Sequence, residues 1–98
     1  MRERLFFTYM LASRRNGTLY CGVTNDLVRR TAEHREGAGR SFTLRHAVTR
    51  LVWFETHPTA LHAIRREKRI KSWPRDWKVA LIEGGNPEWR DLWFEIGW

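Results

Sequence analysis

Glu67 stands where an apolar residue is expected in a predicted helix over residues 59–72. The apolar positions of that helix are Ala60, Ala63, Ile64 and Ile70. Glu67 follows Ala63 by four positions and precedes Ile70 by three, so the helical period places it on the same stripe. A carboxylate on an inward-facing stripe is costly unless it is paired with a cation or binds a metal ion. The helix alone therefore leaves two interpretations open, a metal ligand or a salt bridge to one of the neighbouring arginines.

A second group of candidate residues lies on a predicted helix over residues 27–36. Leu27, Arg30 and His34 follow one another at spacings of three and four, so they share one face of that helix. Arginine can bind a phosphate through two hydrogen bonds, and histidine can carry a proton near neutral pH. Ordinary surface cations on a half-exposed helix would give the same spacing, so this pair alone does not establish a site.

The tyrosines Tyr9 and Tyr20 are the only two in the chain, and they lie on the two strands of a predicted hairpin. A turn centred near Asn16 would place them roughly across from one another, as aromatic pairs in sheets often are. Gly22 follows Tyr20 by two residues, and a glycine in a strand allows close approach of another group. Without further context, these residues are explained by packing.

The elements that must position these residues follow from the sequence pattern. Asn16-Gly17 is a strong hairpin signal between expected strands at residues 5–12 and 18–23. Helix caps, glycines and prolines then bound the remaining elements. These are a helix at 27–36, a basic and mobile loop at 38–48, a strand at 50–56, and helices at 59–72, 75–83 and 86–94. The order β-β-α-β-α-α-α predicts one α+β domain over residues 1–98, with a three-stranded antiparallel sheet flanked by helices.

The charge of the chain indicates a polyanionic partner. Lys and Arg number 18 against 11 Asp and Glu, which gives a net charge of +7, and fifteen of the cations are arginine. Arginine pairs with phosphate in a planar fork and stacks on bases, so nucleic acid is the simplest partner.

Cys21 is the only cysteine, so no internal disulfide can form and a reducing compartment is expected. No window approaches the length of an apolar membrane span, and the apolar run near the N-terminus is too short for a secretory signal. These features predict a cytoplasmic protein. The histidines His46, His57 and His62 lack metal-ligand spacing, so a zinc site is not expected.

Taken in order, the candidate residues resemble the pattern of the GIY-YIG nuclease family. Phe7-Thr8-Tyr9 stands in the place of the GIY triplet, and Tyr20-Cys21-Gly22 in the place of YIG. Arg30 and His34 match the arginine and histidine that follow on the first helix, and Glu67 matches the later metal-binding glutamate.

The resemblance runs from about residue 5 to residue 92 and is strongest to the small stand-alone members, which are related to the nuclease domain at the N-terminus of an excinuclease. The first triplet keeps only its tyrosine, and Cys21 replaces isoleucine in the second, so these departures should affect packing rather than chemistry. Asn86 is similar to the family's late asparagine, although it also reads as a helix cap.

The resemblance implies a metal-dependent endonuclease that hydrolyses phosphodiester bonds in DNA, with a possible role in repair or recombination. Glu67 would hold Mg²⁺ or Mn²⁺, and Arg30 would contact the phosphate. One tyrosine would accept the proton of the attacking water, and His34 would orient a tyrosine or relay protons. The choice between Tyr9 and Tyr20 stays open, and Gly22 and Asn86 are candidate supporting residues.

Further cations are candidate contacts to the nucleic-acid backbone, which would give affinity without sequence preference. They are Arg40, Arg45, Arg65, Arg66, Arg69 and Lys71. The alternative function is a weakly active or inactive nucleic-acid-binding module of the same fold. Neither the DNA structure that is cut, nor the choice of DNA over RNA, nor a protein partner that supplies specificity follows from the sequence. A three-helix DNA-reading domain is excluded by the opening hairpin.

Overall fold

The computed structural model describes residues 5–36 and 47–96. Their elements are β1 (Phe6–Ala12), β2 (Leu19–Thr24), α1 (Leu27–Arg35), β3 (Arg50–His57), α3 (Ala60–Lys71), α4 (Arg75–Gly85) and the 3-10 helix η1 (Leu92–Glu95). The strands form one antiparallel sheet in the order β2-β1-β3. The predicted α+β fold, a three-stranded antiparallel sheet flanked by helices, is confirmed. Most of the loop expected at residues 38–48 lies outside the described residues.

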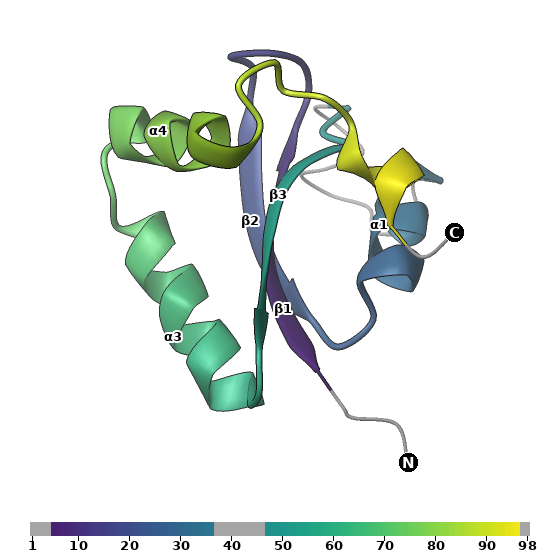
Figure 1. The fold of residues 1–98 in the computed structure, drawn as a ribbon, viewed down its shortest axis with the longest axis vertical. Coiled ribbons are helices and arrows are strands. Elements are labelled where there is room, and N and C mark those ends of the chain that lie inside the picture. The colour runs from purple at the N-terminus through teal and green to yellow at the C-terminus, as the bar shows by residue number, and fades with distance from the viewer. Residues whose placement is uncertain (1–4, 37–46, 97–98) are drawn as a thin grey trace.

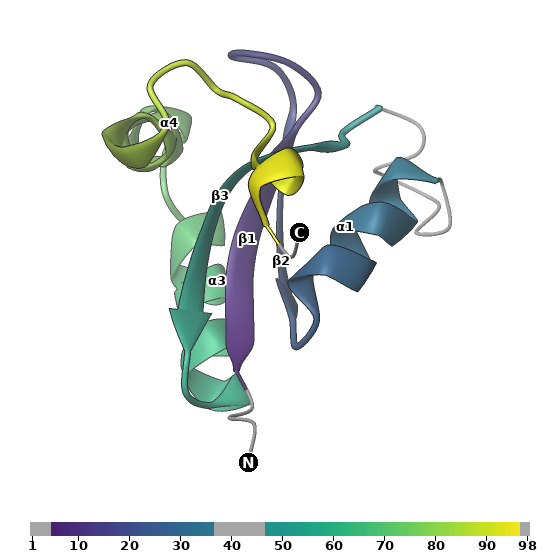
Figure 2. The same cartoon turned by 45° about the vertical axis from the view of Figure 1, so that its right-hand side comes forward.

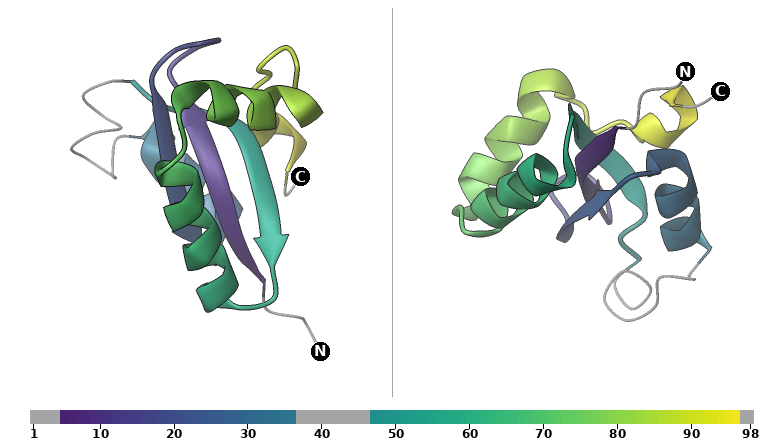
Figure 3. Two further views of the ribbon diagram at one scale, coloured as in Figure 1. Left: turned by 90° about the vertical axis from the view of Figure 1, so that its left-hand side faces the viewer. Right: turned by 90° about the horizontal axis from the view of Figure 1, so that it is seen from below.

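The sheet separates two layers of helices (Figures 1 and 3). The helices α3 and α4 cover one face, and α1 and η1 lie on the other (Figure 2). Successive residues of a strand point to opposite faces, so β1 contributes alternately to both layers. Its Met10 packs with Ile70 and Ile82 of the first layer, while Tyr9 and Leu11 pack with Leu27 of the second.

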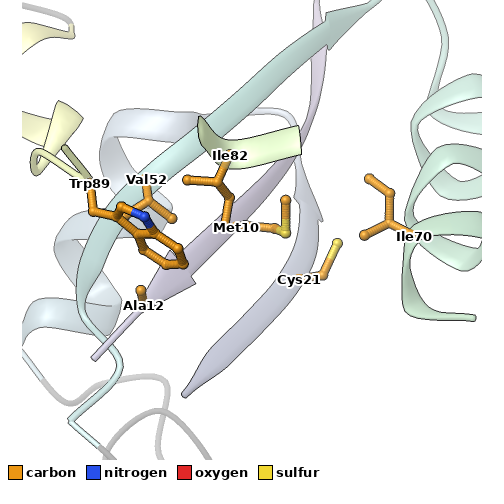
Figure 4. Close-up of a cluster of buried hydrophobic side chains, with 7 residues drawn as sticks. All are labelled: Met10, Ala12, Cys21, Val52, Ile70, Ile82 and Trp89. Carbon is orange, nitrogen blue, oxygen red and sulfur yellow. The ribbon is translucent and has the colours of Figure 1, made fainter. Parts of the chain in front are cut away.

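A buried cluster on the α3–α4 face holds this layer together (Figure 4). Met10 and Cys21 come from the two strands of the hairpin and lie beside Ile70 of α3. Trp89 is fully buried and donates its indole N–H to Glu83 at 2.8 Å. Trp89, in the chain that follows α4, thus covers Ala12 and Val52 of the sheet.

A bulge in β3 explains the position of Asn86. Met10 pairs with Trp53 and Leu11 with Leu51, so Val52 has no partner across the ladder. The Asn86 side-chain amide, which is almost fully buried, donates to the Val52 carbonyl oxygen at 3.1 Å and satisfies it.

The prediction of the last helix was wrong. We expected an α-helix at residues 86–94 with Asn86 as its N-cap, but Asn86 is the C-cap residue of α4. Its side chain bonds to β3 and to the backbone of Arg90, and Trp89 has a φ of 57°, which an α-helix does not allow. The chain therefore turns after α4 and forms only the short helix η1. None of the helices within residues 5–36 and 47–96 has the length and apolar character that a membrane crossing requires.

Candidate active site

The two tyrosines lie on the α1 face of the sheet, but they are not directly opposite one another. Tyr9 pairs with Gly22 and Leu11 pairs with Tyr20, so the tyrosines are diagonal neighbours with ring centroids 6.3 Å apart. The expectation that they lie roughly across from one another is therefore confirmed, with a diagonal offset in the register. The Ser13 N–H donates to the Thr18 carbonyl oxygen, and this bond closes the hairpin.

Gly22 leaves the space that the Tyr9 side chain fills. A Cβ atom at position 22 would lie 2.7 Å from the Tyr9 hydroxyl oxygen, 2.8 Å from its Cζ and 3.0 Å from Cε2 of Tyr20. These distances are shorter than van der Waals contact, so a side chain at this position would displace both rings. The glycine of the second triplet is thus required by the packing of the two tyrosines.

Helix α1 brings Arg30 and His34 to the same place. Asp26 caps the helix by accepting the Arg29 N–H, and Leu27 packs into the core beneath Tyr9. His34 lies one turn after Arg30 and is 2 % exposed. The predicted shared face of Leu27, Arg30 and His34 is confirmed.

Tyr9, His34 and Arg30 form a buried polar network. The Tyr9 hydroxyl oxygen lies 3.0 Å from Nε2 of His34, and Arg30 also hydrogen-bonds to Tyr9. Arginine only donates, so the hydroxyl oxygen accepts from Arg30 and its proton is available to His34. In this arrangement a neutral His34 accepts that proton on Nε2 and carries its own on Nδ1.

The electrostatics agree with that assignment. Burial and the Arg30 guanidinium lower the pKa of His34 below its ordinary value of 6.5, which keeps the ring neutral. Burial, reinforced by Tyr20, raises the pKa of Tyr9 well above its ordinary value, although Arg30 opposes this. Tyr9 is therefore a protonated tyrosine in this network.

Arg30 also faces a polar cleft of about 160 Å³ at the start of α1. Its Nη1 lies 3.1 Å from Glu33, and its side chain is 38 % exposed. The remaining walls come from Thr24, Asn25, Asp26 and Arg29. One end of Arg30 is thus held by Tyr9 and Glu33, while the other end can meet an anion from solvent.

Glu67 occupies the expected stripe of α3, between Ala63 and Ile70, which are both fully buried. Its side chain is 19 % exposed and pairs with Lys71 at 3.2 Å. The buried Thr8 hydroxyl donates to the Ala63 carbonyl oxygen at 2.8 Å and fixes the helical turn before Glu67. Ile64, which we placed on the same stripe, is instead 38 % exposed.

The resemblance also leads to the expectation that the hairpin, the first helix and the Glu67 helix converge on one face of the sheet, and the structure contradicts this. Tyr9, Tyr20, Arg30 and His34 gather on the α1 face, whereas Glu67 belongs to α3 on the opposite face (Figure 3). The reason is the alternation of β1, in which Thr8 points to α3 and Tyr9 to α1. The two groups can therefore act on one ligand only around the free edge of β2, which is an outer strand.

Glu67 does approach that edge. The Glu67 carboxylate adds to burial in raising the pKa of Cys21, the β2 residue next to Tyr20, to about 11. Tyr20 and Cys21 point to opposite faces of the outer strand. Glu67 and Tyr20 thus lie on the two sides of the outer strand β2.

Glu67 could offer a divalent cation one carboxylate, so such a cation would have to be shared with a substrate. Among the described residues, no three His, Cys, Asp or Glu side chains are grouped so that they could hold a metal ion. A cation there would have one protein carboxylate and would take its other ligands from water and phosphate, as Mg²⁺ often does. The pair with Lys71 joins a half-buried carboxylate to an exposed ammonium group at i,i+4, so a cation that binds Glu67 has to displace only a solvent-facing partner.

The candidate DNA-binding cations divide into three groups. Arg65 and Arg69 are exposed and form no ion pair within residues 5–36 and 47–96, whereas Lys71 is exposed but paired with Glu67. Arg66 is bound instead to Glu55 at 3.0 Å and lies over the rings of Trp53 and Trp73, so it serves packing. Arg40 and Arg45 lie outside the described residues.

The sequence did not single out two residues that belong to this arrangement. Glu33 lies three positions after Arg30, and that spacing is a readable signal for the observed ion pair. Thr8 carries no such signal, because its partner is a backbone carbonyl 55 positions away. Asn86 lies on the α3–α4 face, where its hydrogen bonds tie the end of α4 to β3.

Replacing Gly22 with alanine should destabilise the protein by about 1–3 kcal/mol, because the added methyl group overpacks the two tyrosines. A urea titration followed by circular dichroism measures the change. Gly84→Ala is the matched control, since nothing lies within 4 Å of a Cβ there and alanine is the better helix former. Equal stability of the two variants would contradict the packing role of Gly22.

Acidification should destabilise the protein through His34. The lowered pKa means that the unfolded chain binds the proton more readily, so the stability from neutral His34 is present above about pH 6.5 and is lost as the pH falls. Urea unfolding at about pH 7.5 and 5.5 should show a larger loss for the wild type than for His34→Gln. Parallel pH dependence of the two proteins would refute a neutral, buried His34.

Comparisons with known proteins agree with this geometry. Residues 5–80 match the GIY-YIG catalytic domain family, and this range includes every candidate catalytic residue. The chain is 39 % identical over 80 residues to a UPF0213 protein of Nitratidesulfovibrio vulgaris, covering 82 % of this chain and 72 % of that protein. It is also 41 % identical over 68 residues to a UPF0213 protein of Haloquadratum walsbyi, covering 69 % and 76 % of the two chains.

A solved structure shares the fold. The solution NMR structure of the UPF0213 protein BH0048 from Bacillus halodurans matches with a TM-score of 0.52 at 31 % identity. The match covers 87 % of this chain and 92 % of that one. The extent of these matches shows that the chain belongs to the GIY-YIG catalytic domain family and, within it, to the small UPF0213 proteins.

Proposed function

We propose that this protein is a divalent-metal-dependent endonuclease that hydrolyses phosphodiester bonds in DNA. The observation that carries the proposal is the buried network of Tyr9, His34 and Arg30 beside a polar cleft. Arg30 is held by this network and is still partly exposed toward the cleft, where it can meet a phosphate. The net charge of +7 supports a polyanionic substrate.

Arg30 would bind the non-bridging oxygens of the scissile phosphate. Tyr9 and Glu33 hold its position, so the guanidinium meets the phosphate already oriented. Its permanent charge would stabilise the extra negative charge that develops on the phosphate during attack by water.

Tyr20 is the better candidate for the general base. Tyr9 is fully buried, and its hydroxyl is engaged by His34 and Arg30, so it cannot reach an attacking water molecule. Tyr20 is partly exposed, packs against His34 with ring centroids 5.2 Å apart, and lies at the edge of β2. In this scheme Tyr20 accepts the proton of the water, while Tyr9 and His34 hold Arg30 and Tyr20 in position.

Glu67 would hold Mg²⁺ or Mn²⁺ where the DNA strand crosses the edge of β2. When bound, the cation supplies positive charge to the phosphate and to the leaving 3′ oxygen. The nucleic-acid backbone would extend over Arg65, Arg69 and Lys71, whose contacts depend on salt rather than sequence.

We further propose that residues 1–98 act as one nuclease domain in the cytoplasm, as the single cysteine suggests, in a DNA repair or recombination setting. The domain leaves little surface for sequence reading, so a protein partner would supply specificity. The competing function is a DNA-binding module that does not cut. It predicts binding without cleavage under every metal condition.

The proposal is tested by incubating the protein with labelled duplex, single-stranded and branched DNA, with Mg²⁺, with Mn²⁺ or with EDTA. Cleavage should require the cation, and Tyr20→Phe should lower the rate at saturating DNA by about 10²-fold, as loss of a general base does. Tyr9→Phe should have a smaller effect. Binding without cleavage in every arm would favour the binding module, and a larger loss in Tyr9→Phe would reverse the assignment of the base.

A further inference from the structure

A second cleft lies at the free edge of β2, between the end of α3 and the side of α4. Its volume is about 360 Å³. It is distinct from the polar cleft of Arg30, with which it shares no lining residue. The residues that line it are Met10, Leu19, Tyr20, Cys21, Lys71 and Lys78.

The cleft has an apolar floor and a positively charged rim. Met10 and Cys21 belong to the buried cluster, and Leu19 packs against it, so the floor is apolar (Figure 4). The rim carries two ammonium groups, from Lys71 of α3 and Lys78 of α4. Lys78 forms no ion pair with any residue that the structure describes, and Lys71 pairs only with Glu67 there. An apolar floor under two cations suits a flat apolar ring that is attached to phosphate.

The charges around Cys21 connect this cleft to the candidate catalytic residues. Glu67 raises the pKa of the thiol, whereas Lys71, Lys78 and Arg66 lower it, and Lys71 and Lys78 line the cleft together with Cys21. Tyr20 lines the cleft as well. The proposed general base therefore lines the cleft, and the proposed cation ligand pairs with Lys71 on its rim.

We propose that this cleft receives the base of an unpaired nucleotide next to the scissile phosphate, with Lys71 and Lys78 on the flanking phosphates. The inference rests on the proposed nuclease function and names its substrate class. A base that is paired and stacked within a duplex cannot enter a cleft without being extruded, which costs free energy. DNA with a bulged, flapped or single-stranded nucleotide avoids that cost and should be the preferred substrate.

The first test measures binding in EDTA, where no cleavage occurs. Fluorescence anisotropy compares two duplexes of the same sequence, one fully paired and one with a single bulged nucleotide. The bulged duplex should bind about tenfold more tightly, the effect of one well-placed base. Equal affinity for the two duplexes would overturn the proposal.

Filling the cleft should remove this preference. Leu19 is partly exposed at the edge of β2, so Leu19→Trp would occupy the hollow, and affinity for the bulged duplex should fall to that for the paired one. Leu61→Trp is the matched control, because Leu61 is 55 % exposed near the start of α3, at the other end from Lys71. A Leu19→Trp protein that keeps the tenfold preference would refute the assignment.

Lys78→Gln provides a second variant in case Leu19→Trp does not fold. It should weaken binding of the bulged duplex several-fold more than binding of the paired one, whereas Lys68→Gln, an exposed α3 cation, should affect both alike. An equal effect of Lys78→Gln on the two duplexes would count against the proposal. If the protein cuts DNA but binds both duplexes equally, the proposed nuclease function stands and the proposed base-binding cleft is refuted. If it prefers the bulged duplex but never cuts, the cleft stands and the nuclease function is refuted.

Discussion

Glu67→Gln should lower the rate of DNA cleavage in Mg²⁺ by about 10³-fold, which corresponds to about 4 kcal/mol of lost transition-state stabilisation. The physical reason is that Glu67 is the single carboxylate available to hold the cation at the edge of β2 within the described part of the chain. Glutamine has the same shape but no charge, so it loses the cation. The fold should persist, because the carboxylate pairs only with the exposed Lys71 in the described structure.

Two variants sharpen this measurement, which uses single-turnover cleavage of a labelled DNA. Glu88→Gln removes an exposed carboxylate in the turn after α4 and should cut like the wild type. Lys71→Gln removes the partner of Glu67 and should lower the cation concentration needed for half-maximal cleavage, since nothing then competes for the carboxylate. If Glu67→Gln cuts as fast as Glu88→Gln, Glu67 is not the cation ligand.

Arg30→Gln should reduce the cleavage rate at saturating DNA by about 10²-fold, a typical cost for one lost oxyanion donor. Arg30 is the cation held against Tyr9, and it faces the polar cleft with the rest of its donors. Affinity for DNA should fall only a few-fold, because many other cations contact the backbone. Gel-based cleavage at saturating protein separates the rate from the affinity.

Arg69→Gln is the control for Arg30. Arg69 is exposed on α3 and has no ion pair with another described residue, so its loss should weaken binding slightly and leave the saturated rate unchanged. If Arg30→Gln instead weakens binding and restores the full rate at saturation, Arg30 is an ordinary backbone contact. Its role in the transition state would then be excluded.

Local signals in the sequence were sufficient to predict most of the helices and strands and the part of the candidate site that lies on α1. The helices α1 and α3 begin within one residue of the predicted starts, because the Asp26 and Thr59 side chains each accept a backbone N–H of the first turn. The spacing of Leu27, Arg30 and His34 gave their shared face correctly. Helical spacing is a local property, so the sequence carries it directly.

The errors came from contacts between distant segments. Asn86 looked like a cap for a final helix, but the bulge at Val52 leaves a carbonyl 34 positions away that takes its amide. No local pattern marks that bulge. The same limit applied to Glu67, whose stripe was predicted correctly while its side of the sheet was not. The side on which α3 packs depends on how the chain turns out of β3, which spacing within the helix does not encode.

The central claim is that Arg30 on one face of the sheet and Glu67 on the other act on one phosphodiester around the edge of β2. Four single-turnover rates test it most directly, those of the wild type, Arg30→Gln, Glu67→Gln and the double variant. Residues that act as a unit are strongly non-additive, so the double variant should cut about as slowly as the slower single variant. A rate reduced by the product of the two single losses would show that the two residues act independently and would contradict the claim.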